Sequence, residues 1–396
     1  MGSEIVGLHY RSGKPVRVSM KSGRITSMTP LRRKASGLPW IAPGLVDLQV
    51  NGYAGSDFNA SRPSAETVSA VARGLAGVGV TTFLPTVITA APEAIEAAVR
   101  AVVSGCGRDP EAGRAAAGIH LEGPFICPED GARGAHAREH VRPPDPDLVE
   151  RWRRAGEGKV RLLTMSPEWP GSEAFIARCA GSGLLVAIGH TGASPEQVRA
   201  AAAAGARLST HLGNGTHAQL RRHPNYLWEQ LAEDRLWASL IADGFHLPDA
   251  VLKVALRSKG PHAILVSDCV PQAGLAPGTY DTTACGRVVL ESSGRLHLER
   301  DASLLAGSAL PILRGIERLA AAGLCGFADA WERASTRPAE LLGLPQAGGL
   351  AAGAPADLAV FRRDGERVIV LRTLKGGRTV YEAGEDRSFS SALRQS

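Results

Sequence analysis

The segment LLVAIGHTGASPEQVRAAAAAG (residues 184–205) decides the fold, because it joins a short apolar run to a helix through a compact turn. The run LLVAI has the length and composition of a buried strand, and His190 follows it. Ser194 is then an N-cap, Pro195 takes the first helical position and Gln197 completes a capping box. The segment is therefore one strand–helix unit of an α/β protein.

The same kind of unit recurs through the middle of the chain. Apolar runs alternate with helix-like stretches such as AETVSAVARGLAG, and the runs lie at residues 44–50, 79–85, 116–123, 160–165, 184–190, 206–212, 237–244 and 262–268. Eight strand–helix units over roughly 300 residues predict a (β/α)8 TIM-type barrel.

Both ends of the chain are rich in β-strand patterns instead. Short strands are expected within residues 4–28 and again within 356–384. They predict a small β-sandwich domain built from residues 1–42 and 345–390, which leaves residues 43–344 for the barrel. The stretch TYDTTACGRVVLESSGRLHLE (279–299) has a hairpin pattern and is expected to be a flap outside the barrel.

Composition excludes several classes of protein. The chain has 396 residues, 44% hydrophobic and 21% charged, which is typical of a soluble protein. We expect no membrane span and a cytoplasmic location, because no apolar run reaches roughly 18 residues and no signal pattern opens the chain. The net charge of +6 is dispersed and aromatic residues are only 5%, so we expect no nucleic acid partner. An anionic small substrate explains the charge equally well.

Polar residues end most of the expected barrel strands, and in a barrel those ends meet at one mouth. Glu122, His190 and His211 form the donor set of a catalytic zinc ion with one position open for water. The same set accepts Fe(II) or another divalent ion. Asp268 ends the last strand, where it either exchanges a proton with that water or caps the next turn.

The chain resembles the amidohydrolase superfamily and, within it, the N-acetylglucosamine-6-phosphate deacetylase family. The resemblance covers nearly the whole chain and rests on PGLVDLQVNG (43–52), HLEGPF (120–125), GAH (134–136), GHTGAS (189–194), THLGNG (210–215), IADGFH (241–246), LVSDCVPQAG (265–274), LAGSAL (305–310) and GLAAGAPADLAVF (349–361). It implies a hydrolase that releases acetate from an N-acetylated amino sugar, with N-acetyl-D-glucosamine 6-phosphate as the leading candidate. A different N-acyl compound or a cyclic amide is the alternative, and a catalytically inactive scaffold is a third.

The resemblance also implies roles for individual residues. Glu122, His190 and His211 match the metal ligands, Asp268 matches the catalytic acid/base, and His136 matches a histidine that polarises the acetamide carbonyl. The expected substrate-binding residues are His246, Asn214, Gly215 and Arg222. In the family this arginine reaches in from the neighbouring subunit, so a homodimer is implied.

Two absences bear on the number of metal ions. Many superfamily members carry His-x-His on the first strand, where this chain has Gln49-Val50-Asn51. The fourth strand ends in Met165 instead of the lysine that bridges two metals in dihydroorotase-like enzymes. We therefore expect one divalent ion per subunit, with zinc as the first choice.

The stretch HAQLRRHPNYLWEQL (217–231) departs from the family pattern and puts the sugar in doubt. Six scattered cysteines without a CxxC pair indicate neither disulfides nor a zinc knuckle. Cys127 and Cys269 lie near candidate functional residues, but packing is their expected role.

Overall fold

The computed structural model describes residues 2–282 and 286–384. Its central feature is an eight-stranded parallel sheet in the order β14-β13-β12-β11-β10-β9-β8-β5. The bounds are β5 Leu45–Val50, β8 Val80–Ile88, β9 Ile119–Glu122, β10 Val160–Met165, β11 Leu185–Ile188, β12 Ala206–Ser209, β13 Trp237–Leu240 and β14 Ala263–Leu265. Each expected barrel strand is present. The (β/α)8 prediction is confirmed.

The gap between the first and last barrel strands is closed by contacts beyond β14. Val50 and Cys269 form a parallel bridge, and the Asn51 N–H donates to the Cys269 carbonyl at 2.9 Å. Ser267 Oγ also donates to the Gln49 carbonyl. These contacts bring the segment after β14 beside the end of β5.

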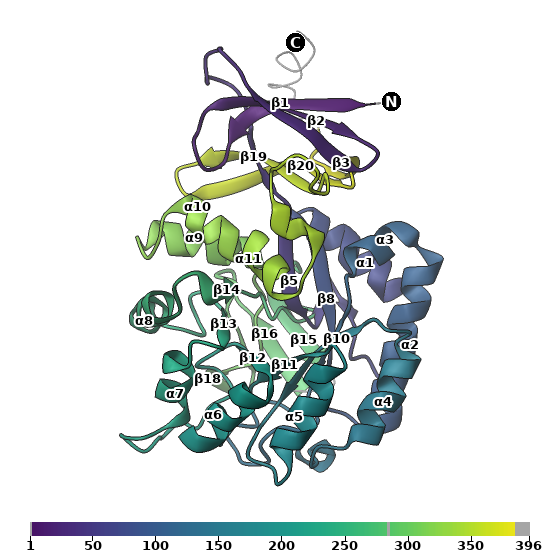
Figure 1. Cartoon of the computed structure of the whole chain (residues 1–396), viewed down its shortest axis with the longest axis vertical. Helices are drawn as coiled ribbons and strands as arrows, with labels where there is room; N and C mark the ends of the chain where they lie inside the picture. The colour runs from purple at the N-terminus through teal and green to yellow at the C-terminus, as the bar shows by residue number, and fades with distance from the viewer. Residues whose placement is uncertain (1, 283–285, 385–396) are drawn as a thin grey trace.

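Helices cover the outside of the barrel (Figure 1). They are α1 Glu66–Ala76, α2 Pro92–Arg108, α3 Pro110–Ala115, α4 Pro146–Ala155, α5 Ser172–Gly181, α6 Pro195–Ala204, α7 Tyr226–Ala232, α8 Asp249–Lys259, α9 Ile312–Ala321, α10 Phe327–Arg333 and α11 Thr336–Leu341, with short 3-10 turns at η1 Arg138–His140, η2 Gly260–His262 and η3 Pro345–Gly348. The capping box that predicts α6 is present, with Ser194 and Gln197 as reciprocal partners. None of the helices in the described residues combines the length and apolar character needed to cross a membrane.

The barrel interior is apolar over the part where the strands begin. A separate cluster of buried side chains fills it: Val46, Leu48, Leu84, Leu162, Ala187, Leu208, Ile241, Ile264 and Val266, with Ala339 and Leu342 from the α11 region. This packing fills the interior with apolar side chains, and the predicted site residues lie where the strands end.

Strands from both chain ends form a second sheet of seven strands in the order β21-β20-β19-β4-β1-β2-β3. Their bounds are β1 Ser3–His9, β2 Pro15–Lys21, β3 Arg24–Pro30, β4 Trp40–Pro43, β19 Leu358–Asp364, β20 Arg367–Lys375 and β21 Arg378–Glu382. Figure 1 shows the purple N-terminal strands lying over the yellow C-terminal ones. The β-domain built from both termini is confirmed, whereas the boundaries 1–42 and 345–390 stay a prediction, and residues 385–390 lie outside the described part.

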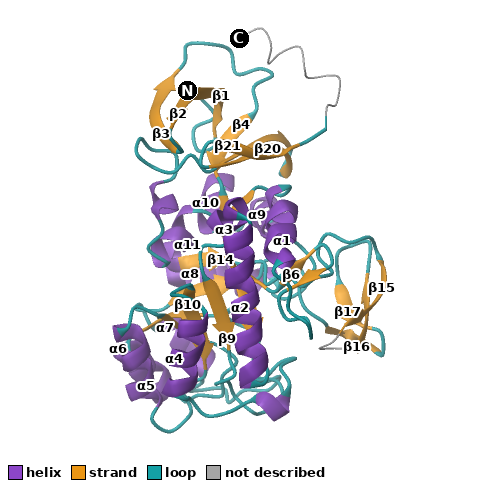
Figure 2. Cartoon of the chain, turned by 90° about the vertical axis from the view of Figure 1, so that its right-hand side faces the viewer, coloured by secondary structure: helices purple, strands orange, loops and turns teal. Residues whose placement is uncertain are grey.

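The expected flap is a sheet of its own, made of β15 Gly278–Thr282, β16 Gly286–Leu290, β17 Leu296–Leu298 and β18 Asp301–Leu305. Figure 2 shows it standing to one side of the barrel. Residues 283–285, within the predicted hairpin, lie outside the described residues. A two-stranded ribbon, β6 Gly52–Tyr53 with β7 Ser56–Asp57, follows β5.

Candidate active site

The candidate residues lie where barrel strands end. Glu122 is the last residue of β9, His190 and His211 follow β11 and β12, and Asp268 follows β14. His190, His211 and Asp268 have positive φ angles of 50°, 28° and 50°. This left-handed conformation is costly for residues with a side chain, and it persists where the surrounding structure imposes it. Strain of this kind clusters at functional sites.

Three predicted ligands converge on one point. Glu122 Oε1 lies 3.2 Å from His190 Nε2 and 2.9 Å from His211 Nε2, and the two Nε2 atoms are 3.1 Å apart. Ligands of a tetrahedral zinc ion, with bonds of about 2.0–2.2 Å, are separated by about 3.3 Å. The donor set therefore fits a divalent ion in both chemistry and spacing.

The orientation of His190 suits a metal ligand. Its Nδ1 is 3.0 Å from the Ala132 carbonyl oxygen, which accepts the Nδ1 proton and leaves Nε2 with a free lone pair. Gly215 packs against the ring, and a Cβ there would lie only 2.6 Å from His190 Nδ1. Gly215 therefore leaves room for the imidazole, and its predicted substrate contact stays a prediction.

The electrostatics keep Glu122 negative. Burial opposes its ionisation, but hydrogen bonds and attraction from His190 and His211 hold its pKa well below the usual range. Burial also lowers the pKa of His211, yet the Glu122 carboxylate raises it to about 9. A buried carboxylate that attracts positive charge is what a cation site requires.

His136 borders the same centre. Its Nε2 is 3.3 Å from His190 Nε2, and its Nδ1 is 2.9 Å from Thr89 Oγ1. Burial lowers the pKa of His136 to about 3, so the ring is neutral near pH 7. The donor atoms of Glu122, His136 and His190 lie within 4.8 Å of one another, so the position suits either a further ligand or a group facing a bound carbonyl.

Asp268 lies beside this donor set without being part of it. Asn51 Nδ2 donates to Asp268 Oδ1 at 2.7 Å. Burial and the negative charge of Glu122 raise the pKa of Asp268 to about 7. A carboxyl group with a pKa near neutrality can both accept and return a proton.

The expected substrate-binding residues His246, Asn214 and Arg222 differ in burial and in their hydrogen-bond partners. The His246 ring is held by Asp243 at 2.7 Å from Nδ1, and Asn214 Nδ2 is buried without a hydrogen-bond partner among the described residues. An orphaned buried donor is uncommon and suits a site that a ligand completes. Arg222 is exposed and makes no side-chain hydrogen bond or ion pair within the described residues, so one chain alone does not bring it to the centre.

The sequence predicted no contact for Gln49 and Asn51. It indicated only that they stand where many superfamily members have two metal-binding histidines. Gln49 Nε2 donates to Glu122 Oε1 at 2.8 Å, and Asn51 holds Asp268. Two amides at the end of a mostly apolar, buried strand were the available signal. Cys269 packs as expected, with its thiol 3.3 Å from the Gly52 carbonyl oxygen.

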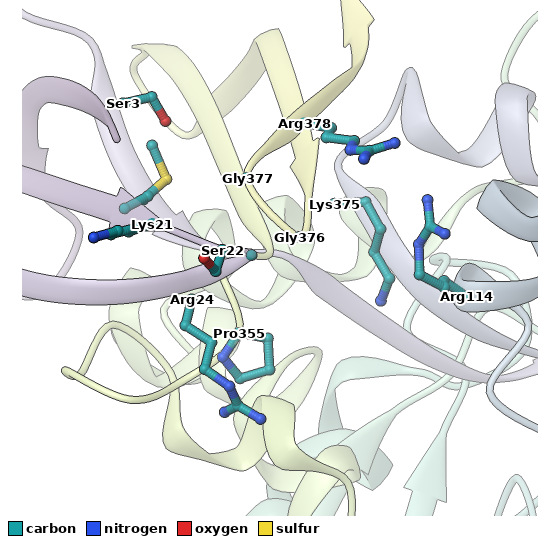
Figure 3. Close-up of a pocket in the computed structure, with 12 residues that line it drawn as sticks. Ser3, Lys21, Ser22, Arg24, Arg114, Pro355, Lys375, Gly376, Gly377 and Arg378 are labelled. Atoms are coloured by element: carbon teal, nitrogen blue, oxygen red, sulfur yellow. The ribbon is translucent and has the colours of Figure 1, made fainter. Parts of the chain in front are cut away.

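A cavity of about 580 Å³ lies elsewhere, between the terminal sheet and α3. Figure 3 shows Lys21 and Arg24 on one side of it and Arg114, Lys375 and Arg378 on the other. None of the predicted site residues lines this basic cavity.

Comparison with known proteins agrees with this geometry. A family model described as the amidohydrolase family matches residues 40–380. This chain belongs to the amidohydrolase family. Among family members, it is 33% identical to the human N-acetylglucosamine-6-phosphate deacetylase over 94% of each chain.

Solved structures of relatives share the whole architecture. One is a variant of the Mycobacterium smegmatis N-acetyl-D-glucosamine-6-phosphate deacetylase, with one aspartate replaced by alanine, in complex with N-acetyl-D-glucosamine-6-phosphate. It has a TM-score of 0.84 and 29% identity, covering 96% of this chain and 99% of that one. The Thermotoga maritima deacetylase gives a TM-score of 0.83 and 26% identity, with 97% and 100% covered.

Proposed function

We propose that this amidohydrolase removes acetate from N-acetyl-D-glucosamine 6-phosphate and leaves D-glucosamine 6-phosphate. One observation carries the proposal. In a chain that aligns over 94% of its length with a deacetylase of this name, Glu122, His190 and His211 converge beside Asp268 at the barrel mouth.

Glu122, His190 and His211 would hold one divalent ion at this centre, with zinc the first choice and iron an alternative. Such an ion supplies a lowered pKa for a bound water and polarisation of a carbonyl oxygen. Gln49 and Asn51 support a single catalytic ion, because their amides hold Glu122 and Asp268 where other superfamily members carry metal-binding histidines.

The remaining chemistry belongs to this chain's own side chains. Asp268 takes a proton from the attacking water and later gives it to the departing amine nitrogen, as its pKa of about 7 allows. The neutral His136 ring, anchored by Thr89, borders the position proposed for the acetamide carbonyl, and with its proton on Nε2 it would donate a hydrogen bond to the developing negative charge.

Substrate recognition falls to His246, Asn214 and Arg222. Asn214 Nδ2 has an unmet hydrogen bond to offer, and Asp243 fixes the tilt of His246. Arg222 is exposed in one chain, so we propose that it reaches the substrate phosphate of a second copy in a homodimer. A guanidinium matches phosphate geometry.

A related hydrolase acting on a different N-acyl compound or a cyclic amide is the second candidate. Two observations favour this second candidate. Arg222 is exposed and lies away from the centre, and the stretch 217–231 departs from the family pattern. Measuring acetate release from a panel of N-acetyl sugars, with and without a 6-phosphate, separates the two. Turnover that requires both the acetyl group and the phosphate supports the deacetylase. Turnover of an unrelated amide alone supports the related hydrolase.

A further inference from the structure

A second group of metal-binding side chains lies in the loops at the barrel mouth, outside the centre described above. It consists of Cys127, Glu129 and His217, whose donor atoms all lie within 4.8 Å of one another. Cys127 and Glu129 follow β9, whereas His217 follows β12. The group therefore joins two loops that are about 90 residues apart along the chain.

Two of the three side chains, Cys127 and His217, lie against Gly192. A Cβ at that glycine would lie 3.1 Å from His217 Cε1, 3.3 Å from Cys127 Sγ and 3.2 Å from Glu168 Oε2. Glu168 is already fixed, since its Oε2 accepts from the Gly192 N–H at 2.5 Å and from Ser166 Oγ at 2.7 Å. A rigid carboxylate thus borders the group on its inner side.

His217 has a partner on each ring nitrogen. Its Nδ1 is 2.9 Å from the Tyr226 hydroxyl, and the opposite nitrogen, Nε2, is 2.9 Å from Glu129 Oε2. Binding a metal through Nε2 requires the ring proton on Nδ1, where the Tyr226 hydroxyl oxygen can accept it. Tyr226 is buried, so it can hold the ring in place.

The structure assigns Cys127, Glu129 and His217 as a second zinc site, which we propose ties the loop after β9 to the loop after β12. One sulfur, one nitrogen and one carboxylate oxygen form a donor set that suits zinc, with water or Glu168 as the fourth ligand. As the metal–sulfur bond forms, the Cys127 thiol proton passes to solvent. This ion would be additional to the single ion expected at Glu122.

The site shares no residue with the catalytic centre but adjoins it. The loops it joins also carry His136 and Asn214. A bound ion would hold both loops in place around the substrate. Whether this second ion binds does not depend on which substrate the enzyme hydrolyses.

Cobalt(II) tests the proposal on the full-length, metal-free protein. Only a cysteine ligand gives a thiolate-to-cobalt charge-transfer band, and the Glu122 centre has none. We expect two equivalents of cobalt to bind to the wild type, with the band accompanying one of them. The band and one equivalent should be lost in Cys127→Ser and in Glu129→Gln, whose exposed side chain carries little risk to folding.

Two further variants sharpen the result. Tyr226→Phe should weaken the thiolate-linked cobalt site by about 10- to 100-fold, the usual effect of losing a group that orients a ligand. Cys325→Ser, which changes a partly buried cysteine elsewhere, should keep the band. A wild type that binds one equivalent without a band, or a band that survives in Cys127→Ser, overturns the proposal.

Discussion

Replacing Asp268 by Asn tests the proton-transfer role most sharply. The change keeps the shape of the side chain, and the amide oxygen can still accept from Asn51 Nδ2, now 2.7 Å from Oδ1. What is lost is a group whose pKa of about 7 lets it accept and return a proton. Positioned general acid–base catalysis contributes about 10² to 10⁴-fold.

The expected loss lies at the upper end of that range. The same carboxyl serves both the attack of water and the departure of the amine, so kcat should fall by about 10⁴-fold, equivalent to roughly 5.5 kcal/mol of activation free energy. Bound metal, measured by elemental analysis, should stay at the wild-type level, because Asp268 lies outside the Glu122 donor set. Substrate should still bind.

The assay is acetate release at saturating substrate, with a matched buried aspartate as the control. Asp47 is buried on β5 and accepts hydrogen bonds from the Gln49 and Ser267 backbone N–H groups, so Asp47→Asn changes a similarly buried carboxyl that has no hydrogen bond to Glu122 or Asp268 among the described residues. Its kcat should stay within a few fold of wild type. An Asp268→Asn enzyme within tenfold of wild type would refute the reasoning and make His136 the first alternative.

Four further outcomes are expected. Arg222→Ala should raise KM for the phosphorylated substrate by roughly 10- to 150-fold while Arg221→Ala does not; equal losses on an unphosphorylated analogue would remove the phosphate assignment. His211→Ala should lose the catalytic ion and activity together but keep the cobalt–thiolate band, and retention of that ion would contradict the ligand assignment. Fully loaded Cys127→Ser should contain one divalent ion per chain by elemental analysis, and two would contradict a single catalytic metal. Burial raises the pKa of Asp47 to about 6, so the native state keeps a proton that the unfolded state has lost. Denaturant unfolding should therefore show wild-type stability falling relative to Asp47→Asn, by about 2 kcal/mol between pH 4 and pH 6, and a flat difference would contradict this.

The barrel could be predicted because its signals are local. Each strand is a short apolar run, and Ser194 with Gln197 marks a helix start that tertiary contacts do not override. The meeting of Glu122 with His211 followed from the fold, since strand ends converge in any barrel of this kind.

Contacts between distant side chains could not be predicted in the same way. The donation from Gln49 to Glu122 depends on register across β5, β8 and β9, which no local pattern encodes. The sequence alone predicted a packing role for Cys127. Of its two partners, His217 comes from another loop and Glu129 from an exposed turn, so no local motif marks them as a group. The contact of Arg222 with a substrate bound to a second chain stays a prediction.

The central claim is that an ion at Glu122, His190 and His211 drives deacetylation. The most direct measurement follows acetate and D-glucosamine 6-phosphate from N-acetyl-D-glucosamine 6-phosphate, in Cys127→Ser protein stripped of metal and then given one equivalent of zinc. We predict no turnover before zinc and equal amounts of both products after it. Undiminished turnover by the stripped protein, or no acetate after zinc is bound, would contradict the claim.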